Sequence, residues 1–503
     1  MFKRTSSIFI IAALLVVVSI DAKAQRAPSY GGTLIISGSQ PMYSLDPTAA
    51  EHDEEYLFAD LVYSNLTKLK SDYTPEPELA ENWKSSKSGD HWIFELRKGV
   101  KWHNGKELTA DDVVYSLTRA KQPGTTTQSL IKAIDSVEAL DQYTVKINMN
   151  SVYPDIPSTL ASPHLSILPK WNKHFATVPI GTGPFKVSQI IPGESVMVSK
   201  FDGYFEKGLP YLDAIKLVFH PDPAATIASL LAGDIDVAWN GRPEWEPLIK
   251  KNPNVELLKA PGFAHNCIEI MTDRKPFDDV RVRQAIAYTI DREMLVATVL
   301  IGHGIPASDS PMPPANPYYN SEIPLRKQDY KKARSLLEQA GYSQGLKLTL
   351  FTSESRAGQL GTALALQDMA KPAGIEIKVV NVDPSRFWSD TWKKEPFLVS
   401  NWYTRFLPNE AFWPYFHSTG QWNFAHYRNR KMDELLEKAQ SETDIEKRKK
   451  LYKEVQAILY NDVPWIVTHF RSALWGIRKG VHYEGIRLYP TNFNEVYKSW
   501  KEK

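Results

Sequence analysis

The chain alternates short apolar runs with longer amphipathic stretches along most of its 503 residues. The runs at 32–37, 92–96 and 216–219 are rich in Ile, Leu, Val and Phe, which is typical of strands. Segments 223–232 and 329–339 carry apolar residues at helical spacing, and a glycine follows each within two residues. This alternation predicts an α/β or α+β architecture rather than a helical bundle or a β-sandwich.

Two segments have the order strand, helix, strand that is typical of a parallel sheet. The first runs from 216 to 238, and the second joins strands at 347–351 and 376–380 through a helix at 359–369. Ligands of open α/β sheets tend to lie beyond the carboxyl ends of the parallel strands. The residues that follow the first unit are therefore candidates for ligand contact: Trp239, Asn240, Gly241 and Arg242.

The first 24 residues have the pattern of a secretory signal. Lys3 and Arg4 precede an apolar run at 8–18, and Ala22-Lys23-Ala24 has the small residues of a cleavage site. The alternative is an uncleaved anchor, but the run is shorter than the roughly 20 residues that a spanning helix needs. No Cys lies directly after the run, which argues against a lipid anchor. We expect cleavage after Ala24 and a soluble chain in the periplasm.

Composition narrows the possible functions further. The chain has 60 Lys and Arg against 58 Asp and Glu, a formal net charge of +2, so it lacks the basic excess typical of nucleic-acid or acidic-membrane binding. Cys267 is the single cysteine, and no intrachain disulfide can form. Cys267 and His265 face the same side of an extended segment, but we expect a packed or cleft-lining thiol rather than a nucleophile with its base.

Several motifs in a fixed order then identify a family. The most specific are Glu78-Leu79-Ala80-Glu81-Asn82-Trp83 and the stretches 94–106 and 108–113, and the supporting ones are 181–185, 276–285 and 333–342. Across essentially the whole mature chain, this order resembles the large extracytoplasmic solute-binding proteins of the peptide, opine and nickel class (extracellular solute-binding protein family 5). These proteins serve ATP-binding-cassette (ABC) importers.

The resemblance implies the two-lobed α/β fold of a periplasmic binding protein with a hinge. Lobe I is expected at 25–265 with an extra subdomain at about 76–180, lobe II at 266–484, and a return to lobe I at 485–503. Hinge closure on a solute would create the surface that the inner-membrane permease, with its ATPase subunits, recognises. We therefore expect a monomeric receptor that is not an enzyme and has no cofactor.

The nature of the solute depends most on segment 401–412. Peptide binders of this family usually carry an Asp here for the ammonium group of the peptide, whereas a rough alignment puts Arg405 at or beside that position. A guanidinium is a planar fork suited to carboxylate or phosphate, so we expect a ligand with an anionic group. The structural alternative is that Arg405 pairs with Glu410 or another acid as a brace.

Aromatic residues near the expected cleft suggest its walls, because small-molecule sites combine apolar surfaces with a few polar groups. Most of the 14 Trp are nevertheless expected in cores, and we favour Trp402, Trp239 and Tyr43 as ligand contacts. Aromatic faces stack on sugar rings, so an opine or glycosylated solute fits as well as a short peptide. The full predicted set is Tyr43, Trp239, Asn240, Arg242, His265, Trp402, Tyr403, Arg405, Trp422 and Asn423.

Other chemistries are less favoured. The 12 His form no pair at metal-binding helical spacing, so no metal held by the protein itself is expected. A receptor for a nickel or haem chelate is the alternative, with His265, His417 and His426 as the residues to test first. No nucleophile elbow or phosphate loop is present, and Asp111-Asp112 and Asp278-Asp279 suit helix capping rather than catalysis. An exported hydrolase is the distant alternative.

Overall fold

The computed structural model of the chain describes most of the residues after the predicted signal. The described ranges are 27–50, 52–70, 74–122, 127, 130–239, 241–354, 358–383, 386–405, 407–485 and 495–503. The predicted signal at 1–24 and the candidate Asn240 lie outside them. Within these ranges, no helix is long and apolar enough to cross a membrane.

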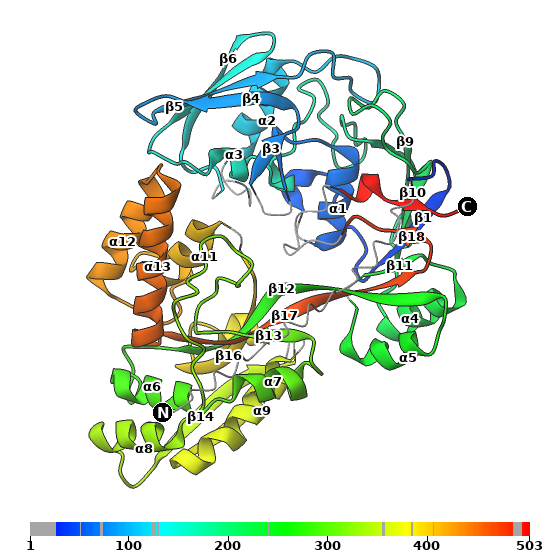
Figure 1. Cartoon of the computed structure of the whole chain (residues 1–503). Helices are drawn as coiled ribbons and strands as arrows, with labels where there is room; N and C mark the ends of the chain where they lie inside the picture. The colour runs from blue at the N-terminus through cyan, green and yellow to red at the C-terminus, as the bar shows by residue number, and fades with distance from the viewer. Residues whose placement is uncertain are drawn as a thin grey trace, which may run out of the picture.

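The largest sheet draws strands from both halves of the chain (Figure 1). Its 11 strands have the order β15-β14-β16-β12-β17-β11-β1-β10-β9-β8, with β13 paired to β17 outside this path. The strands are β1 (Thr33–Gly38), β8 (Phe185–Ile191), β9 (Ser195–Lys200), β10 (Ala214–Phe219), β11 (Val237–Ala238), β12 (Val255–Ile270), β13 (Gly304–Pro306), β14 (Leu346–Ser353), β15 (Ile375–Val382), β16 (Phe397–Tyr403) and β17 (Trp465–Arg478).

The first end of this sheet contains the predicted parallel unit. Strand β10, helix α4 (Pro223–Ala232) and strand β11 follow each other, and Gly233 ends the helix with a φ of 91°. Both strands are parallel to β1, as predicted, but β1 lies between them. Helices α1 (Asp53–Val62) and α5 (Glu246–Lys250) cover this end, where Ile36, Phe58 and Ile215 belong to one buried core.

A separate four-stranded sheet forms the upper part of Figure 1. Its order is β4-β5-β7-β6, and it packs its own core around Trp102, which is fully buried. Thr109 and Asp112 form a capping box at the start of α2. The elements of this part are β2 (Thr67–Leu69), β3 (Pro75–Pro77), β4 (Ala80–Ser85), β5 (His91–Leu96), α2 (Ala110–Ala120), β6 (Ile134–Asp141), β7 (Thr144–Met149) and α3 (Ile156–Thr159).

The other end of the large sheet holds the second predicted unit, in which β14 and β15 are parallel and α9 joins them. Asp279 and Asp329 cap α6 and α8 by accepting from backbone N–H groups, which confirms two predicted helix starts. The helices here are α6 (Val280–Tyr288), α7 (Arg292–Val299), α8 (Tyr330–Gln339), α9 (Gln359–Ala370), α11 (Pro408–Phe416), α12 (Arg430–Ser441) and α13 (Ile445–Asp462).

Short elements complete the chain. They are η1 (Pro47–Ala49), η3 (Pro163–Leu165), η4 (Pro243–Trp245), η5 (Lys371–Ala373), the π-helix η6 (Phe387–Thr391), η7 (Val496–Lys498), β18 (Val481–His482) and β19 (Trp500–Lys501). Strands β18 and β19 pair, and Val496 and Tyr497 pack in the first core beside residues of the N-terminal half.

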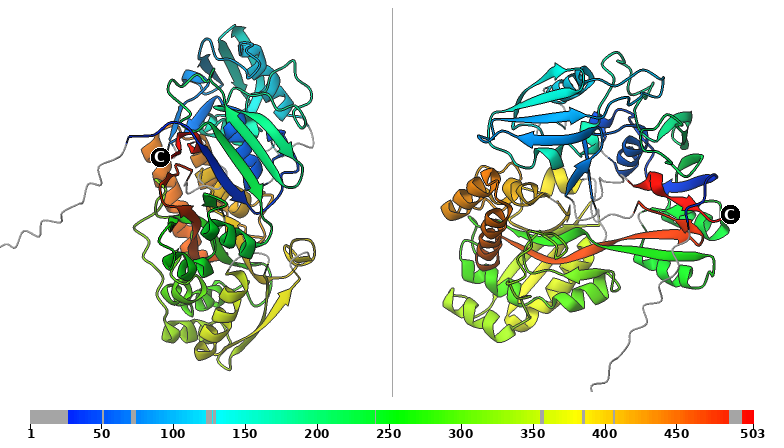
Figure 2. Two further views of the ribbon diagram at one scale, coloured as in Figure 1. Left: turned by 90° about the vertical axis from the view of Figure 1, so that its right-hand side faces the viewer. Right: turned by 45° about the horizontal axis from the view of Figure 1, so that its top comes forward.

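A long antiparallel ribbon of β12 and β17 connects the two ends of the molecule (Figure 2, right). Ala260 packs in the first core, whereas Ile268 packs in the second. The pairing register shifts between Ala260 and Ala264, where Gly262 has a φ of +86°. The lobe boundaries predicted at 265/266 and 484/485 remain predictions, and the first of them falls within this ribbon.

Candidate ligand site

Strand β16 places Trp402 at the centre of a group of aromatic rings. The ring centroid of Trp402 lies 5.6 Å from that of Trp388, 5.5 Å from Trp392 and 5.2 Å from Tyr415. Trp402 also stacks on Trp422 at 6.0 Å and on Trp465 at 6.3 Å. We call these six residues the aromatic cluster: Trp388, Trp392, Trp402, Tyr415, Trp422 and Trp465. Trp388 is 37% exposed, so the cluster reaches the protein surface.

Arg405 lies just beyond β16, and its charge acts on groups from several elements. Burial raises the pKa of Tyr415 in the aromatic cluster, and the Arg405 guanidinium opposes that shift. Burial lowers the pKa of His164 in η3, and Arg405 lowers it further. Arg405 therefore lies within electrostatic reach of both the aromatic cluster and the N-terminal half of the chain.

Glu410 is the acid that the structural alternative for Arg405 requires. It lies in the first turn of α11, where burial raises the pKa of its carboxyl and Arg405 lowers it. Asp155, which precedes α3, adds a further repulsion that raises the same pKa. The arrangement accommodates a brace between Arg405 and Glu410 as well as an anionic group of a ligand beside Arg405.

His265 is a predicted site residue whose titration is strongly altered by burial. Its imidazole is 3% exposed and lies 5.7 Å from the ring of Phe470, its partner on β17. Burial lowers its pKa to about 3, and the charges of Arg471 and Arg405 lower it as well. Within the described residues, neither ring nitrogen has a hydrogen-bond partner. The ring is therefore neutral at pH 7 and retains capacity for a polar partner.

The remaining predicted residues lie apart from this group or on another face. Trp239 is 5% exposed and packs in the first core, as the alternative of a core tryptophan predicts. Tyr43 is 72% exposed and contacts His52 edge-on, and Arg242 is exposed before η4. Tyr403 follows Trp402 on β16, so its side chain points to the opposite face of the sheet.

Asn423 has a structural task in its own loop. Its Nδ2 donates to the carbonyl oxygens of His417 and Tyr427, and its Oδ1 accepts from the backbone N–H of Tyr427. These bonds hold the loop, and the ligand contact of Asn423 stays a prediction. Among the predicted residues, the structure thus brings together Trp402, Trp422, Arg405 and His265.

Sequence reasoning missed Glu269, Trp388 and Trp392. Glu269 is fully buried, and both indole N–H groups of Trp392 and Trp402 donate to it. The sequence did hold a signal for Glu269. In an extended segment, residues 265, 267 and 269 lie on the same face, and Glu269 is the charged residue among these three.

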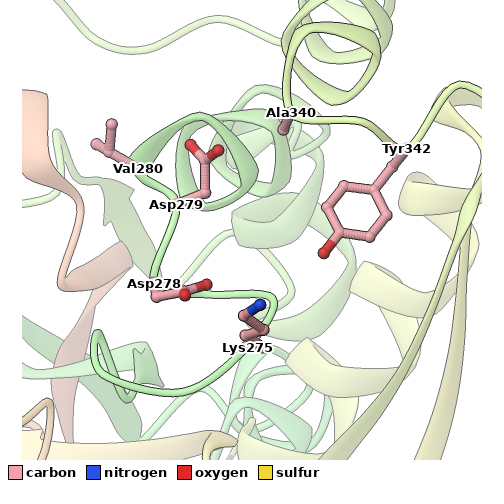
Figure 3. Close-up of a pocket in the computed structure, with 6 residues that line it drawn as sticks. All are labelled: Lys275, Asp278, Asp279, Val280, Ala340 and Tyr342. Carbon is pink, nitrogen blue, oxygen red and sulfur yellow. The ribbon is translucent and has the colours of Figure 1, made fainter.

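The hollow shown in Figure 3 lies between the start of α6 and the end of α8. It has a volume of about 530 Å³ and is lined by Lys275, Asp278, Asp279, Val280, Ala340 and Tyr342. Asp279 is already engaged, because its carboxylate caps α6 and pairs with Arg281. The described residues also contain no group of three His, Cys, Asp or Glu side chains that could hold a metal ion.

Comparison with solved structures defines the class of protein. The Helicobacter pylori periplasmic binding protein DppA, solved with the peptide STSA, is 25% identical, has a TM-score of 0.78 and covers 94% of this chain and 99% of its own. The binding protein AgaA from A. tumefaciens R10, solved with agropinic acid, is 26% identical, has a TM-score of 0.75 and covers the same shares. The chain thus has the two-lobed fold of periplasmic binding proteins, as predicted.

Sequence comparison gives the family. The pattern of the bacterial extracellular solute-binding proteins, family 5 (middle region), matches residues 74–424. The glutathione-binding protein GsiB of Escherichia coli K12 is 30% identical over 451 residues, which are 86% of this chain and 88% of that protein. This chain belongs to the family 5 extracellular solute-binding proteins, the receptors of ABC importers, which confirms the resemblance identified from its motifs.

Proposed function

We propose that this protein captures a small solute with an anionic group and that Arg405 holds that group. The solute is a short peptide, an opine or a related conjugate. The mature chain acts as a monomer in the periplasm after cleavage at Ala24, and it delivers the solute unchanged to an inner-membrane permease and its ATPase subunits. The position of Arg405 carries this proposal.

Arg405 combines a fixed positive charge with partial exposure beside the aromatic cluster. The neighbouring His265 is neutral at pH 7, so it adds no competing cation to the site. A guanidinium can bind a carboxylate through two parallel hydrogen bonds, and such charge-assisted bonds are stronger than neutral ones. A ligand with a carboxylate near one end and an apolar or sugar-like body would use both Arg405 and the aromatic rings.

The ligands named for the relatives support this choice of chemistry. GsiB is named as a glutathione-binding protein, AgaA was solved with agropinic acid, and DppA was solved with a peptide. Each of these ligands is an acid or carries a carboxylate. A receptor with an arginine at the site fits this shared feature better than one that selects a cation.

Glutathione and its diethyl ester form a matched pair of test ligands, since the ester blocks both carboxylates. We expect calorimetry to show tighter binding of the acid than of the ester, and Arg405→Ala to weaken binding of the acid about 10- to 100-fold. Arg405→Lys keeps the charge without the fork and is expected to fall between. Arg430→Ala, which removes a 93% exposed side chain on α12, serves as the control.

Unchanged affinity of Arg405→Ala together with a lowered melting temperature would assign Arg405 to the brace with Glu410 and overturn the proposal. Native mass spectrometry of the exported protein adds an independent test, because a retained solute is identified by its mass. A copurified nickel or haem chelate would favour that alternative receptor instead.

A further inference from the structure

Glu269 is a fully buried carboxyl group that accepts hydrogen bonds from two rings of the aromatic cluster. Its Oε1 accepts from Trp402 Nε1 at 2.6 Å and from the hydroxyl of Ser400, and its Oε2 accepts from Trp392 Nε1 at 3.2 Å. The thiol of Cys267 lies 3.7 Å from Oε1 as a weaker donor. Each of these donors is a neutral group, so the carboxyl is stabilised by dipoles rather than by a full positive charge.

The two indole bonds determine how the rings lie. An indole has a single N–H donor on its edge, so a bond from Nε1 to Glu269 fixes which edge of Trp402 and of Trp392 points inward. The faces of Trp402 are then directed at its neighbours, with interplanar angles of 30° to Trp422 and 17° to Trp465. The edge of Trp402 is therefore held at Glu269 while its faces build the stack.

This orientation matters for the neighbourhood of Arg405. Tyr415 contacts Trp402 at 5.2 Å and Trp465 at 4.9 Å, and it is also the cluster residue on which the charge of Arg405 acts. A tilt of Trp402 would therefore displace the ring that lies next to the guanidinium. The charge of Glu269 also raises the pKa of Tyr415, whereas its hydrogen bonds act on the two indoles.

We propose that Glu269 is a positioning residue that sets the orientation of Trp402 and Trp392 and thereby shapes the aromatic wall of the ligand site beside Arg405. This inference rests on the proposed function as far as the wall contacts a ligand. The orientation of the rings themselves does not depend on the identity of the ligand, so the two parts can be tested separately.

The substitution Glu269→Gln keeps the size of the side chain and changes its hydrogen-bonding groups. A carboxylate offers two acceptor oxygens, whereas a carboxamide offers one oxygen and one N–H₂ group. In Glu269→Gln, one of the two indole N–H groups must therefore face another donor, whichever way the amide turns. Trp392→Phe removes one of these donors, so the amide oxygen can return to Trp402 in the double variant.

The first measurement is near-ultraviolet circular dichroism of the protein without ligand, which reports how tryptophan rings couple. We expect Glu269→Gln to change the tryptophan bands in the wild-type background and to change them much less in the Trp392→Phe background, with unchanged far-ultraviolet spectra. Glu256→Gln, an exposed carboxylate on the same strand β12, is the control and is expected to leave the bands unaltered.

The second measurement is glutathione affinity in the same four proteins. Glu269→Gln is expected to weaken binding about 10-fold, the equivalent of one lost hydrogen bond, and Trp392→Phe is expected to restore most of that loss. An equal effect of Glu269→Gln on the near-ultraviolet bands in both backgrounds would overturn the positioning role. If Arg405→Ala left affinity unchanged while the dichroism cycle showed coupling, the proposed function would fail and the positioning role would stand.

Discussion

Asp309 and Glu269 are two buried carboxylates that the protein stabilises in different ways. Asp309 is 1% exposed and lies between two buried arginines, with Arg292 Nη2 at 2.5 Å from Oδ1 and Arg326 Nε at 2.7 Å from Oδ2. Glu269 is 0% exposed, and the donors that it has among the described residues are all neutral. One acid is therefore compensated by charge and the other by oriented dipoles.

The difference indicates different tasks. Removing Asp309 would leave two guanidinium groups buried without their anion, so its position ties three segments of the chain together. Removing the charge of Glu269 leaves no ion behind, because its donors are uncharged, but it changes which ring edges are held. Charge compensation thus secures the fold around Asp309, whereas dipole compensation around Glu269 sets the geometry of the aromatic cluster.

The largest expected effect is that of Asp309→Asn. We expect the free energy of unfolding to fall by about 3–5 kcal/mol, because the amide cannot neutralise Arg292 and Arg326 in the protein interior. Urea unfolding followed by far-ultraviolet circular dichroism measures this loss. Asp368→Asn, with a side chain 75% exposed, is the matched control and should leave stability unchanged. A loss for Asp309→Asn as small as that of the control would contradict the contrast with Glu269.

Arg448 and Asp155 form a charged pair, like Asp309 with its arginines, but this pair joins two parts of the molecule. We therefore expect its loss to have an intermediate effect on stability. Arg448 in α13 donates through Nη1 at 2.5 Å, and also through Nη2, to the carboxylate that precedes α3. We expect Arg448→Met to lower the free energy of unfolding by about 2 kcal/mol, less than Asp309→Asn, because water can reach Asp155 once this junction loosens.

The double variant Arg448→Met with Asp155→Asn tests the reason for that loss. It should recover part of the stability because no buried charge remains without a partner. Hydrogen exchange of α3 and α13 then reports whether the junction itself has loosened. If the double variant were as unstable as the sum of the two single ones, the loss would come from packing rather than from a stranded charge.

Local patterns predicted much of the fold. The caps at Asp279 and Asp329 and the parallel units around α4 and α9 follow from residues a few positions apart, and the structure confirms them. The insertion of β1 between β10 and β11 and the 16-residue strand β12 were not predicted. Pairs such as Glu269 with Trp465 join residues far apart in sequence, so no local periodicity reports them.

The candidate site was predicted in part for a similar reason. Trp402 and Arg405 lie in one short segment whose charge differs from the family pattern, and they could be found there from sequence. Glu269, Trp388 and Trp392 become meaningful only when β12, β16 and η6 meet, because the signal is a convergence of donors on one carboxyl. Trp239 shows the opposite case, in which an aromatic residue after a strand packs in the core.

The stability that Glu269 contributes depends on pH. Burial raises the pKa of Glu269 above its ordinary value of 4.5, so the folded state binds this proton more tightly than the unfolded state. Its contribution to the free energy of unfolding is therefore present at low pH and is lost as the pH rises through the raised value, by at most about 1.4 kcal/mol per pH unit.

Urea unfolding of wild type and Glu269→Gln across pH 4 to 8 measures this contribution as the difference between their free energies of unfolding. The buried histidines titrate in both proteins, so their contributions cancel in that difference. We expect the stability of wild type relative to Glu269→Gln to decrease as the pH rises. A difference that increases with pH would mean that the four donors lower the pKa more than burial raises it, and Glu269 would then resemble an acid compensated by full charge.

The smallest expected effect is that of Cys267→Ala, which removes one donor from Glu269. A thiol is a weak donor, and its sulfur lies 3.7 Å from Oε1, whereas Trp402 Nε1 lies 2.6 Å from the same atom. We expect a loss of about 1 kcal/mol from the small cavity and an unaltered pH dependence relative to wild type. Ser400→Ala, which removes the hydroxyl bonded to the same oxygen, should change that pH dependence. If Cys267→Ala altered it as much as Ser400→Ala, the thiol would rank with the indoles and the hydroxyl in holding the carboxylate.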